Sequence, residues 1–349
     1  MSAAVVFRCN VSAQVGVGHL MRCREMAQVL RGLGIGSAIL GPPESMANAA
    51  DKTLFQHWIP VPERGTSEQD AARVLDMCAQ LGTRHAVMDD YRIDPAYQTL
   101  LRTQGIRWLQ QFDASAPWMF QCDLLVNASP YETREQYLPW LDDPARTDTL
   151  FGPAYAVMRP EFARLSPRTD GRAVKRIFVG FGGGDDRGAL STTLEALAGR
   201  FGTGVTLVLV SGPNNPRNDA IKAQVNALPK GQAELHIGPP DMPALMAGCD
   251  LAVIGGGTMS YEAAICGLPT LFVALAPNQD RPCMGWNALT GALYLGQVGA
   301  VTSTTLHHAV LGVIEDDSTR QSMAARGRSL VDGKGGTRLV GALLERDLL

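Results

Sequence analysis

The sequence lacks the features that would assign it to a membrane, an extracellular space or a metal. It has no apolar run near the ~20 residues that a membrane-spanning helix requires, and its seven cysteines form no Cys-x-x-Cys pair. Scattered cysteines, odd in number and mostly in apolar surroundings, are typical of reduced core thiols. The segment Met1 to Asn10 shows no basic stretch followed by an apolar one, so we expect no signal peptide. These features favour a cytoplasmic protein with no stable membrane insertion and no bound metal.

An excess of positive charge is also absent. The formal net charge is -3 at pH 7, whereas a general nucleic-acid-binding domain carries a basic stripe. We therefore expect no nucleic-acid partner. An anionic small molecule is not excluded, because a few arginines and helix N-termini suffice to bind one.

The common nucleotide-binding and hydrolase motifs are missing as well. The turn Gly16-Val17-Gly18-His19 has no further glycine at Met21, and the next apolar stretch ends Leu40-Gly41-Pro42 without an acidic residue to hold a ribose. The sequence has no Gly-x-x-x-x-Gly-Lys-Ser/Thr loop, no Gly-x-Ser-x-Gly elbow and no His-Glu-x-x-His pair. We therefore expect neither NAD nor FAD, and no other cofactor.

What the sequence does contain is a repeated alternation of short β-branched runs and longer segments of helical period, which is typical of βα units with a parallel sheet. The expected strands are 5–9, 37–40, 85–89, 107–111 and 123–126, followed by 177–181, 205–210, 234–237, 251–254 and 270–273. The expected helices include 19–33, 69–81, 95–103, 189–200 and 219–227.

Two domains are predicted from this alternation. Residues 163–174 combine Pro167, Gly171 and several arginines without apolar periodicity, which is typical of a linker. We predict an α/β fold with two doubly wound, Rossmann-like domains, 1–162 and 175–349, facing each other across a cleft. A last helix comes after a break at 332–336, and whether it packs back on the first domain is left open. In open α/β sheets ligands bind beyond the carboxyl ends of the strands, so we expect the ligand in this cleft.

The turn that ends in His19 is the first candidate site. Its glycines, Gly16 and Gly18, let backbone N–H groups approach a ligand, and the start of a helix favours negative charge there. The helix N-terminus also disfavours an imidazolium, and a neutral imidazole can take a proton from an attacking water. The same pattern fits a tight turn in which His19 only caps the helix, so both interpretations stay open at this point.

Two further turns carry glycine triplets after an apolar strand. Gly183 and Gly184 lie in the first, where we expect a backbone-lined anion pocket. Gly256, Gly257 and Thr258 lie in the second, with Glu262 four residues after Thr258. Because that spacing is one beyond a capping box, the Glu262 carboxylate remains available to accept hydrogen bonds from ribose hydroxyls. A surface glutamate that only complements the helix dipole is the alternative.

Other polar residues come directly after expected strands. Asn278 and Gln279 come after 270–273, where amides can bind sugar hydroxyls or orient a water. Asp89 ends 85–89, and Asp90 and Tyr91 follow it; an aspartate here can orient His19 or form an ordinary turn. Arg159 offers a cation just ahead of the linker.

With these segments placed, the chain resembles the UDP-sugar hydrolases of pseudaminic acid biosynthesis, which act on UDP-2,4-diacetamido-2,4,6-trideoxy-β-L-altropyranose. The resemblance rests on the order of several motifs: 14–23 around His19, Asp89-Asp90-Tyr91, 155–162 with Arg159, 179–185, Gly256-Gly257-Thr258 with Glu262, and Asn278-Gln279. This family is similar to the GT-B glycosyltransferase that adds N-acetylglucosamine to the peptidoglycan lipid precursor, but it transfers the sugar to water.

The resemblance implies a GT-B-like fold and hydrolysis at the anomeric carbon of a UDP-sugar, with C–O cleavage, inversion and no metal. It implies that His19 is the base, that Asn278 is a polar residue of the active site, and that Arg159 and Glu262 contact substrate. We add Asp89 as the group that assists His19, and Asp90 and Asn278 stay open as alternatives for this role. The expected binding residues are Gly16, Gly18, Asp90, Tyr91, Arg159, Gly183, Gly184, Gly256, Gly257, Thr258, Glu262 and Gln279.

Two other functions remain open. A GT-B glycosyltransferase would use the same donor site with a hydroxyl acceptor, and a non-catalytic sugar-nucleotide-binding protein would tolerate loss of His19. The sequence indicates no oligomeric state.

Overall fold

The fold is described from a computed structural model, which covers residues 4–11, 18–61, 63–113, 118–165, 173–201 and 204–346. The chain forms two compact units. The first unit comprises Met1–Arg159 and Gly333–Leu349, and the second comprises Pro160–Asp332. The predicted linker, 163–174, lies mostly outside the described residues, and the part of it that the structure shows belongs to the second unit.

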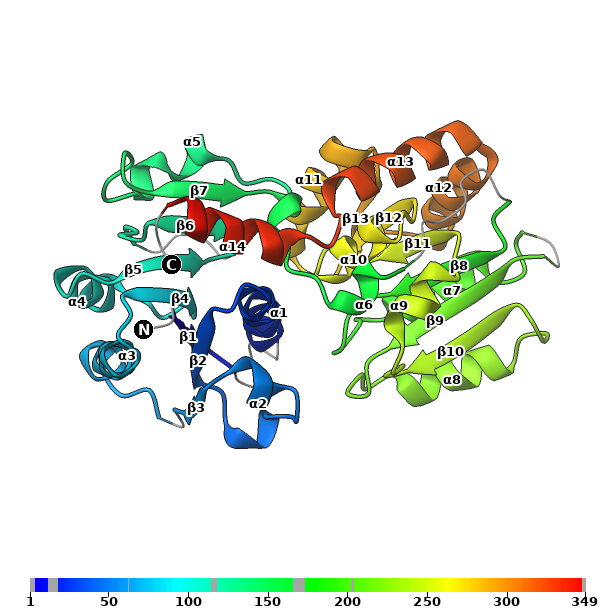
Figure 1. Cartoon of the computed structure of the whole chain (residues 1–349). Helices are drawn as coiled ribbons and strands as arrows, with labels where there is room; N and C mark the ends of the chain where they lie inside the picture. The colour runs from blue at the N-terminus through cyan, green and yellow to red at the C-terminus, as the bar shows by residue number, and fades with distance from the viewer. Residues whose placement is uncertain are drawn as a thin grey trace. The chain divides into compact units, whose positions relative to one another are not determined.

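The first unit is built on a parallel sheet of seven strands in the order β3-β2-β1-β4-β5-β6-β7 (Figure 1). Its strands are β1 (Ala4–Cys9), β2 (Gly36–Gly41), β3 (His57–Pro60), β4 (His85–Asp89), β5 (Arg107–Gln111), β6 (Leu124–Asn127) and β7 (Asp148–Phe151). Its helices are α1 (Gly18–Gly32), α2 (Asp51–Leu54), α3 (Ser67–Leu81), α4 (Pro95–Thr103), α5 (Arg134–Tyr137) and α14 (Gly335–Glu345), with short 3-10 turns at Glu44–Met46, Leu138–Trp140 and Pro153–Tyr155.

The last helix, α14, belongs to this first unit. Leu339, Val340 and Leu343 are buried in the same apolar cluster as Leu20 and Met26 of α1, and the two helices are in contact (Figure 1). Gly335 packs directly against the backbone of Ala156, because a Cβ at position 335 would lie 2.1 Å from the carbonyl oxygen of Ala156. A side chain at residue 335 would therefore displace the start of the helix.

The second unit repeats the same plan with six parallel strands in the order β10-β9-β8-β11-β12-β13. Its strands are β8 (Arg176–Gly180), β9 (Thr206–Ser211), β10 (Ala233–Ile237), β11 (Leu251–Ile254), β12 (Thr270–Ala274) and β13 (Leu293–Gln297). Its helices are α6 (Pro160–Ala163), α7 (Ala189–Leu197), α8 (Asn218–Asn226), α9 (Met242–Ala247), α10 (Met259–Ile265), α11 (Asp280–Thr290), α12 (Ser303–Glu315) and α13 (Asp317–Leu330), with a 3-10 turn at Pro277–Gln279.

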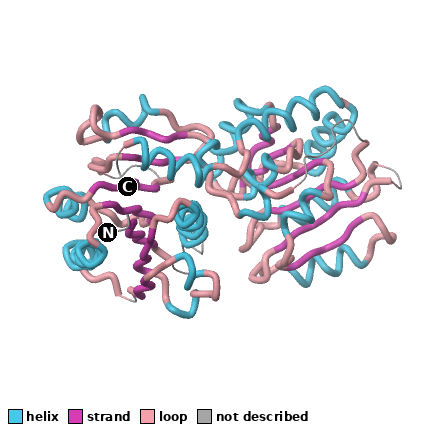
Figure 2. Tube along the Cα trace, viewed as in Figure 1, coloured by secondary structure: helices cyan, strands magenta, loops and turns pink. Residues whose placement is uncertain are grey.

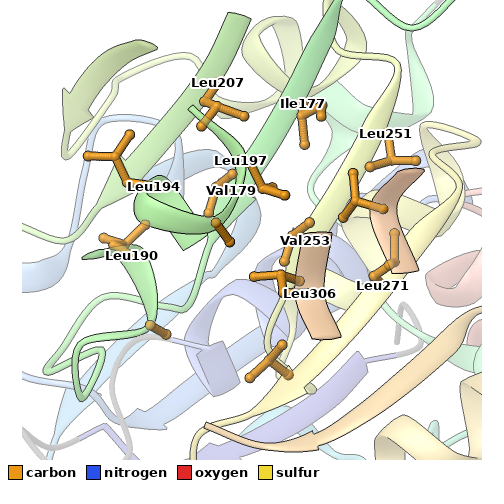
Figure 3. Close-up of a cluster of buried hydrophobic side chains, with 14 of the residues drawn as sticks. Ile177, Val179, Leu190, Leu194, Leu197, Leu207, Leu251, Val253, Leu271 and Leu306 are labelled. Atoms are coloured by element: carbon orange, nitrogen blue, oxygen red, sulfur yellow. The ribbon is translucent and has the colours of Figure 1, made fainter. Parts of the chain in front are cut away.

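Each sheet is covered by helices, as Figure 2 shows for both units. Central strands such as β1, β8 and β11 are therefore largely buried and consist mainly of apolar residues. Figure 3 shows one such core, where Ile177, Val179 and Val253 of the sheet pack against Leu194 of α7 and Leu306 of α12. All seven cysteines are free and buried, which confirms the prediction of core thiols.

In both units the strand order reverses beside the first strand, between β1 and β4 and between β8 and β11. This is the doubly wound arrangement, and it confirms the prediction of two Rossmann-like α/β domains. In such sheets the gap between the two diverging connections, at the carboxyl ends of the central strands, is where ligands bind.

Candidate functional site

In the first unit, the ligand-binding position expected for a doubly wound sheet lies at the carboxyl ends of β1 and β4 and at the start of α1. His19 is the second residue of α1, and only 4% of it is exposed. Its Nδ1 lies 2.9 Å from the backbone oxygen of Asp89, the last residue of β4. Since a carbonyl oxygen only accepts, Nδ1 carries the proton in this hydrogen bond. The neutral ring then has its lone pair on Nε2, the form that a general base requires.

An arginine that was not predicted from the sequence completes this cluster. Arg22 donates from Nε and Nη2 to the two carboxylate oxygens of Asp89, at 2.9 and 2.7 Å, and from Nη1 to Oδ2 of Asp113 at 2.9 Å. Burial alone lowers the pKa of a guanidinium, but the charges of Asp89 and Asp113 outweigh this effect and raise the pKa of Arg22. A signal was present in the sequence, because residue 22 lies three positions after His19 and shares its helix face.

Tyr91 is a further member of this cluster and contacts the imidazole ring of His19. Its ring meets the His19 ring edge to face, with 4.9 Å between centroids, and its hydroxyl donates to Asp113. Burial and the Asp113 carboxylate raise the pKa of Tyr91, so the hydroxyl keeps its proton. The structure thus brings together three predicted residues, His19, Asp89 and Tyr91, with Arg22 and Asp113 in addition.

Asp90 lies elsewhere. It is fully buried, with Arg92 donating to its two oxygens at 2.8 and 2.6 Å and Arg8 at 3.5 Å from Oδ2. Arg8 is itself 2% exposed and is held by Asp70 at 2.9 Å. The Asp90 carboxylate therefore ties the end of β4 to β1 and α3, and we assign it to this ion network instead of to substrate binding.

We expect Asp90→Asn to lower the free energy of unfolding by about 3 kcal/mol at pH 7, because it removes one of the two carboxylates that compensate the buried charge of Arg8. Urea unfolding followed by circular dichroism measures this. The control is Asp185→Asn, which breaks the ion pair of Asp185 with Arg217; the two side chains are 51% and 41% exposed, respectively. We expect this control to change the free energy of unfolding by less than ~1 kcal/mol.

The same substitution has an expected pH dependence. Burial alone would raise the pKa of Asp90, but the hydrogen bonds from Arg92 and the charge of Arg8 lower it below the ordinary 3.8. A carboxyl whose pKa is lower in the folded state stabilises the fold above its unfolded pKa, and this contribution is lost as the pH falls through the folded value. The difference between wild type and Asp90→Asn should thus shrink below about pH 4. A difference that stays constant into acid would contradict this assignment.

In the second unit a pocket of about 270 Å³ opens at the ends of β8 and β11. Five of the predicted residues line it: Gly183, Gly257, Thr258, Glu262 and Gln279. The other five lining residues are Gly182 and Gly255, which belong to the two predicted glycine-triplet turns, and Gly180, Phe181 and Met259, which were not predicted to bind a ligand. Phe181 and Met259 supply an apolar wall beside glycine backbone, which suits a ligand with one flat face and one anionic part.

The glycines of the two loops at this pocket differ in their surroundings. Gly182 has φ 101°, a conformation that favours glycine, whereas Gly256 is packed, since a Cβ there would lie 2.6 Å from Sγ of Cys283. A Cβ at Gly183, Gly184 or Gly257 would meet nothing within 4 Å. At these three positions the absent side chain leaves open space, and two of them, Gly183 and Gly257, line the pocket.

Hydrogen bonds from Ser260 and to Gln279 fix the loop before α10. Ser260 donates from its hydroxyl to the Gly257 carbonyl at 2.7 Å, and Trp286 donates from Nε1 to the same hydroxyl at 2.8 Å. The side-chain oxygen of Gln279 accepts from the backbone N–H of Leu275 at 2.9 Å and of Gly256 at 3.4 Å, so its NH₂ group is the part left to donate to a ligand. Thr258 occupies the N-cap position without a capping hydrogen bond.

The remaining predicted residues lie outside these two clusters. Asn278 is exposed in the 3-10 turn next to Gln279 and does not line the pocket. Arg159 is half-buried at the end of the first unit. Gly18 begins α1 with open space around it, and Gly16 lies outside the described residues.

Membrane spans and metal sites are both absent from the part of the chain that the structure describes. No helix there is long and apolar enough to cross a bilayer, and no group of three or more His, Cys, Asp or Glu side chains is placed to hold a metal ion.

The chain matches no family model, but it is similar to a curated protein. The spore coat polysaccharide biosynthesis protein SpsG of Bacillus subtilis (strain 168) is 28% identical over 195 residues, which are 55% of this chain and 57% of that protein. The chain thus spans little more than half the length of this relative.

Solved structures resemble the whole chain at low identity. MurG of Acinetobacter baumannii superposes with a TM-score of 0.66 at 14% identity, covering 98% of this chain and 99% of MurG. The glycotransferase of kitacinnamycin gives 0.68 at 17% identity over all of both chains. The UDP-GlcNAc 2-epimerase of Neisseria meningitidis, bound to UDP-GlcNAc, gives 0.61 at 13% identity, covering 99% and 100%. The chain therefore has the GT-B fold, with two Rossmann-like domains.

Proposed function

We propose that this chain hydrolyses a UDP-activated sugar, with water attacking the anomeric carbon. The observation that carries the proposal is the His19 geometry: Nδ1–H is fixed on the Asp89 carbonyl at 2.9 Å, which directs the basic Nε2 away from it. In the reaction water gives a proton to Nε2 and bonds to C1, while the C1–O bond breaks and UDP leaves with its electron pair. Configuration at C1 is inverted.

The second unit supplies the nucleotide site in this proposal. Glu262 accepts hydrogen bonds from the ribose, and N–H groups of the loops at Gly183 and Gly257 stabilise the leaving diphosphate. Asn278 and Arg159 contact the sugar or diphosphate when the site is occupied. The structures of similar fold include an epimerase bound to UDP-GlcNAc, which supports UDP as the carrier.

The sugar that we propose is a diacetamido-trideoxyhexose used for a nonulosonic acid of the pseudaminic type. Its support is the motif order from His19 to Gln279 and the similarity to a polysaccharide biosynthesis protein. A cytoplasmic location, where sugar nucleotides are made, agrees with seven buried free thiols.

One experiment separates this proposal from its alternatives. The protein is incubated with UDP-sugars in H₂¹⁸O without acceptor, UDP release is followed, and the product anomer is read by NMR. We expect release without acceptor, ¹⁸O in the sugar hydroxyl and none in UDP, and the inverted anomer first. Release that requires an added hydroxyl compound would identify a glycosyltransferase, which the fold of MurG and of the kitacinnamycin enzyme favours as second candidate. UDP binding without release from any donor would identify a binding protein.

A further inference from the structure

We propose that Arg22 is a positioning residue, which takes up the carboxylate of Asp89 so that Nδ1–H of His19 donates to a backbone carbonyl instead of to a charged group. The kinetic consequence of this inference rests on the proposed function, whereas its structural part concerns the free protein alone.

Two acceptors compete for the proton on Nδ1 of His19. The backbone oxygen of Asp89 lies at 2.9 Å, and the side-chain Oδ1 of the same residue lies at 3.4 Å. That Oδ1 accepts from Nη2 of Arg22 at 2.7 Å, while Oδ2 accepts from Nε at 2.9 Å. A two-point pair of this kind fixes the plane of the carboxylate, so the imidazole is left with the neutral acceptor.

The choice of acceptor matters for the charge on the ring. A carboxylate against Nδ1–H stabilises the imidazolium, whereas a carbonyl fixes the tautomer with much less preference for the charged form. A base must be neutral to accept a proton from water. Arg22 thus favours the reactive state of His19 without any contact to substrate.

The other groups around the ring act through the same arginine. Three titratable groups interact with His19 itself: Asp89 at the end of β4, Tyr91 after β4 and Asp113 after β5. Arg22 and Cys23 on α1 interact with Asp89, and Cys9 on β1 interacts with Cys23. Burial raises the pKa of Cys23, which is therefore uncharged. Burial alone would raise the pKa of Asp113, but the charge of Arg22 and the Tyr91 hydroxyl lower it. Two carboxylates then share one guanidinium, and loss of the guanidinium leaves both facing the imidazole.

The test uses NMR of histidine labelled with ¹³C and ¹⁵N in the free, full-length chain. There are six histidines, and His19→Ala assigns the signal of His19. We expect Arg22→Met to move the titration of this signal upward by about one pH unit relative to wild type. If UDP release takes place, the acidic limb of kcat/KM should move by the same amount, which is about a fivefold loss at the midpoint of the wild-type limb and about tenfold at pH values well below it.

Two variants make the result specific. Arg24 lies on the same helix and forms a similar two-point pair with Asp51, at 2.8 and 2.7 Å. Arg24→Met therefore measures the general effect of losing such a pair, and we expect it to leave the midpoint of the His19 titration unchanged. The double variant Arg22→Met with Asp89→Asn removes one of the two uncompensated charges and keeps the backbone carbonyl, so it should return the titration part of the way towards wild type.

An unchanged His19 titration in Arg22→Met, or an equal shift in Arg24→Met, would overturn the inference. Because the NMR readout needs no substrate, its result is independent of the proposed reaction. If the His19 titration shifts in Arg22→Met but wild type releases no UDP, the hydrolase proposal fails and the role of Arg22 stands. If wild type releases UDP but the titration does not shift in Arg22→Met, the hydrolase proposal stands and the role of Arg22 fails.

Discussion

Replacing His19 with alanine is expected to lower kcat for acceptor-free UDP release by about 10²- to 10⁴-fold, the usual contribution of a positioned general base. The affinity for UDP should change little, because all the residues that line the pocket belong to the second unit. A loss confined to kcat is the signature of an interaction made only in the transition state. Initial rates of UDP release and calorimetric titration with UDP measure the two quantities separately.

The matched control is His85→Ala. His85 begins β4, at the opposite end of the strand from Asp89, and it is half-buried. We expect its kcat to stay within about twofold of wild type, since surface substitutions away from a site have small effects. Asp89→Asn should be milder than His19→Ala, because the backbone oxygen of residue 89 still accepts from Nδ1. A His19→Ala protein that retains more than a tenth of wild-type activity would argue against a base at this position.

Much of the fold could be predicted because central strands carry a strong signal. His85–Asp89, Pro95–Thr103 and Leu251–Ile254 have the expected bounds. Pro95 comes after the N-cap Asp94, whose side chain accepts from the N–H of Tyr97, and such start signals are local. The strands that were not predicted are β3, β7 and β13. They are outer strands of their sheets, and their residues are exposed or half-buried, so the apolar runs that mark them are short or interrupted by polar residues.

The site shows the same limit at single residues. Asp89 and Asp90 are neighbours in the sequence, and they differ in the arginine from a distant part of the chain that contacts each one. Asp89 pairs with Arg22, which is 67 residues away in the sequence, whereas Asp90 lies 3.5 Å from Arg8. Sequence reasoning located the edge of the sheet from the strand pattern. Which of the two carboxylates lies beside the imidazole depends on tertiary pairing, which the local order of residues does not encode.

Gly257→Val is expected to weaken UDP binding by at least about 100-fold, or ~2.7 kcal/mol, while the chain stays folded. A Cβ at this position meets no atom within 4 Å, and its φ is not in the left-handed region. The Gly257 carbonyl is also held by the Ser260 N–H at 3.0 Å and by the Ser260 hydroxyl at 2.7 Å. The added methyl groups thus project into the pocket, where they exclude the ligand and cover the N–H groups that would bind its phosphates.

Calorimetric titration with UDP and a thermal unfolding curve separate this effect from loss of fold. Gly299→Val is the control, since a Cβ at residue 299 also meets open space and the residue does not line the pocket. Gly256→Ala should behave in the opposite way: its Cβ would lie 2.6 Å from Sγ of Cys283 and 3.0 Å from the Gln279 carbonyl, so stability falls together with binding. If Gly257→Val binds UDP as wild type does, the nucleotide does not occupy this pocket, and the assignment of Glu262 to the ribose fails with it.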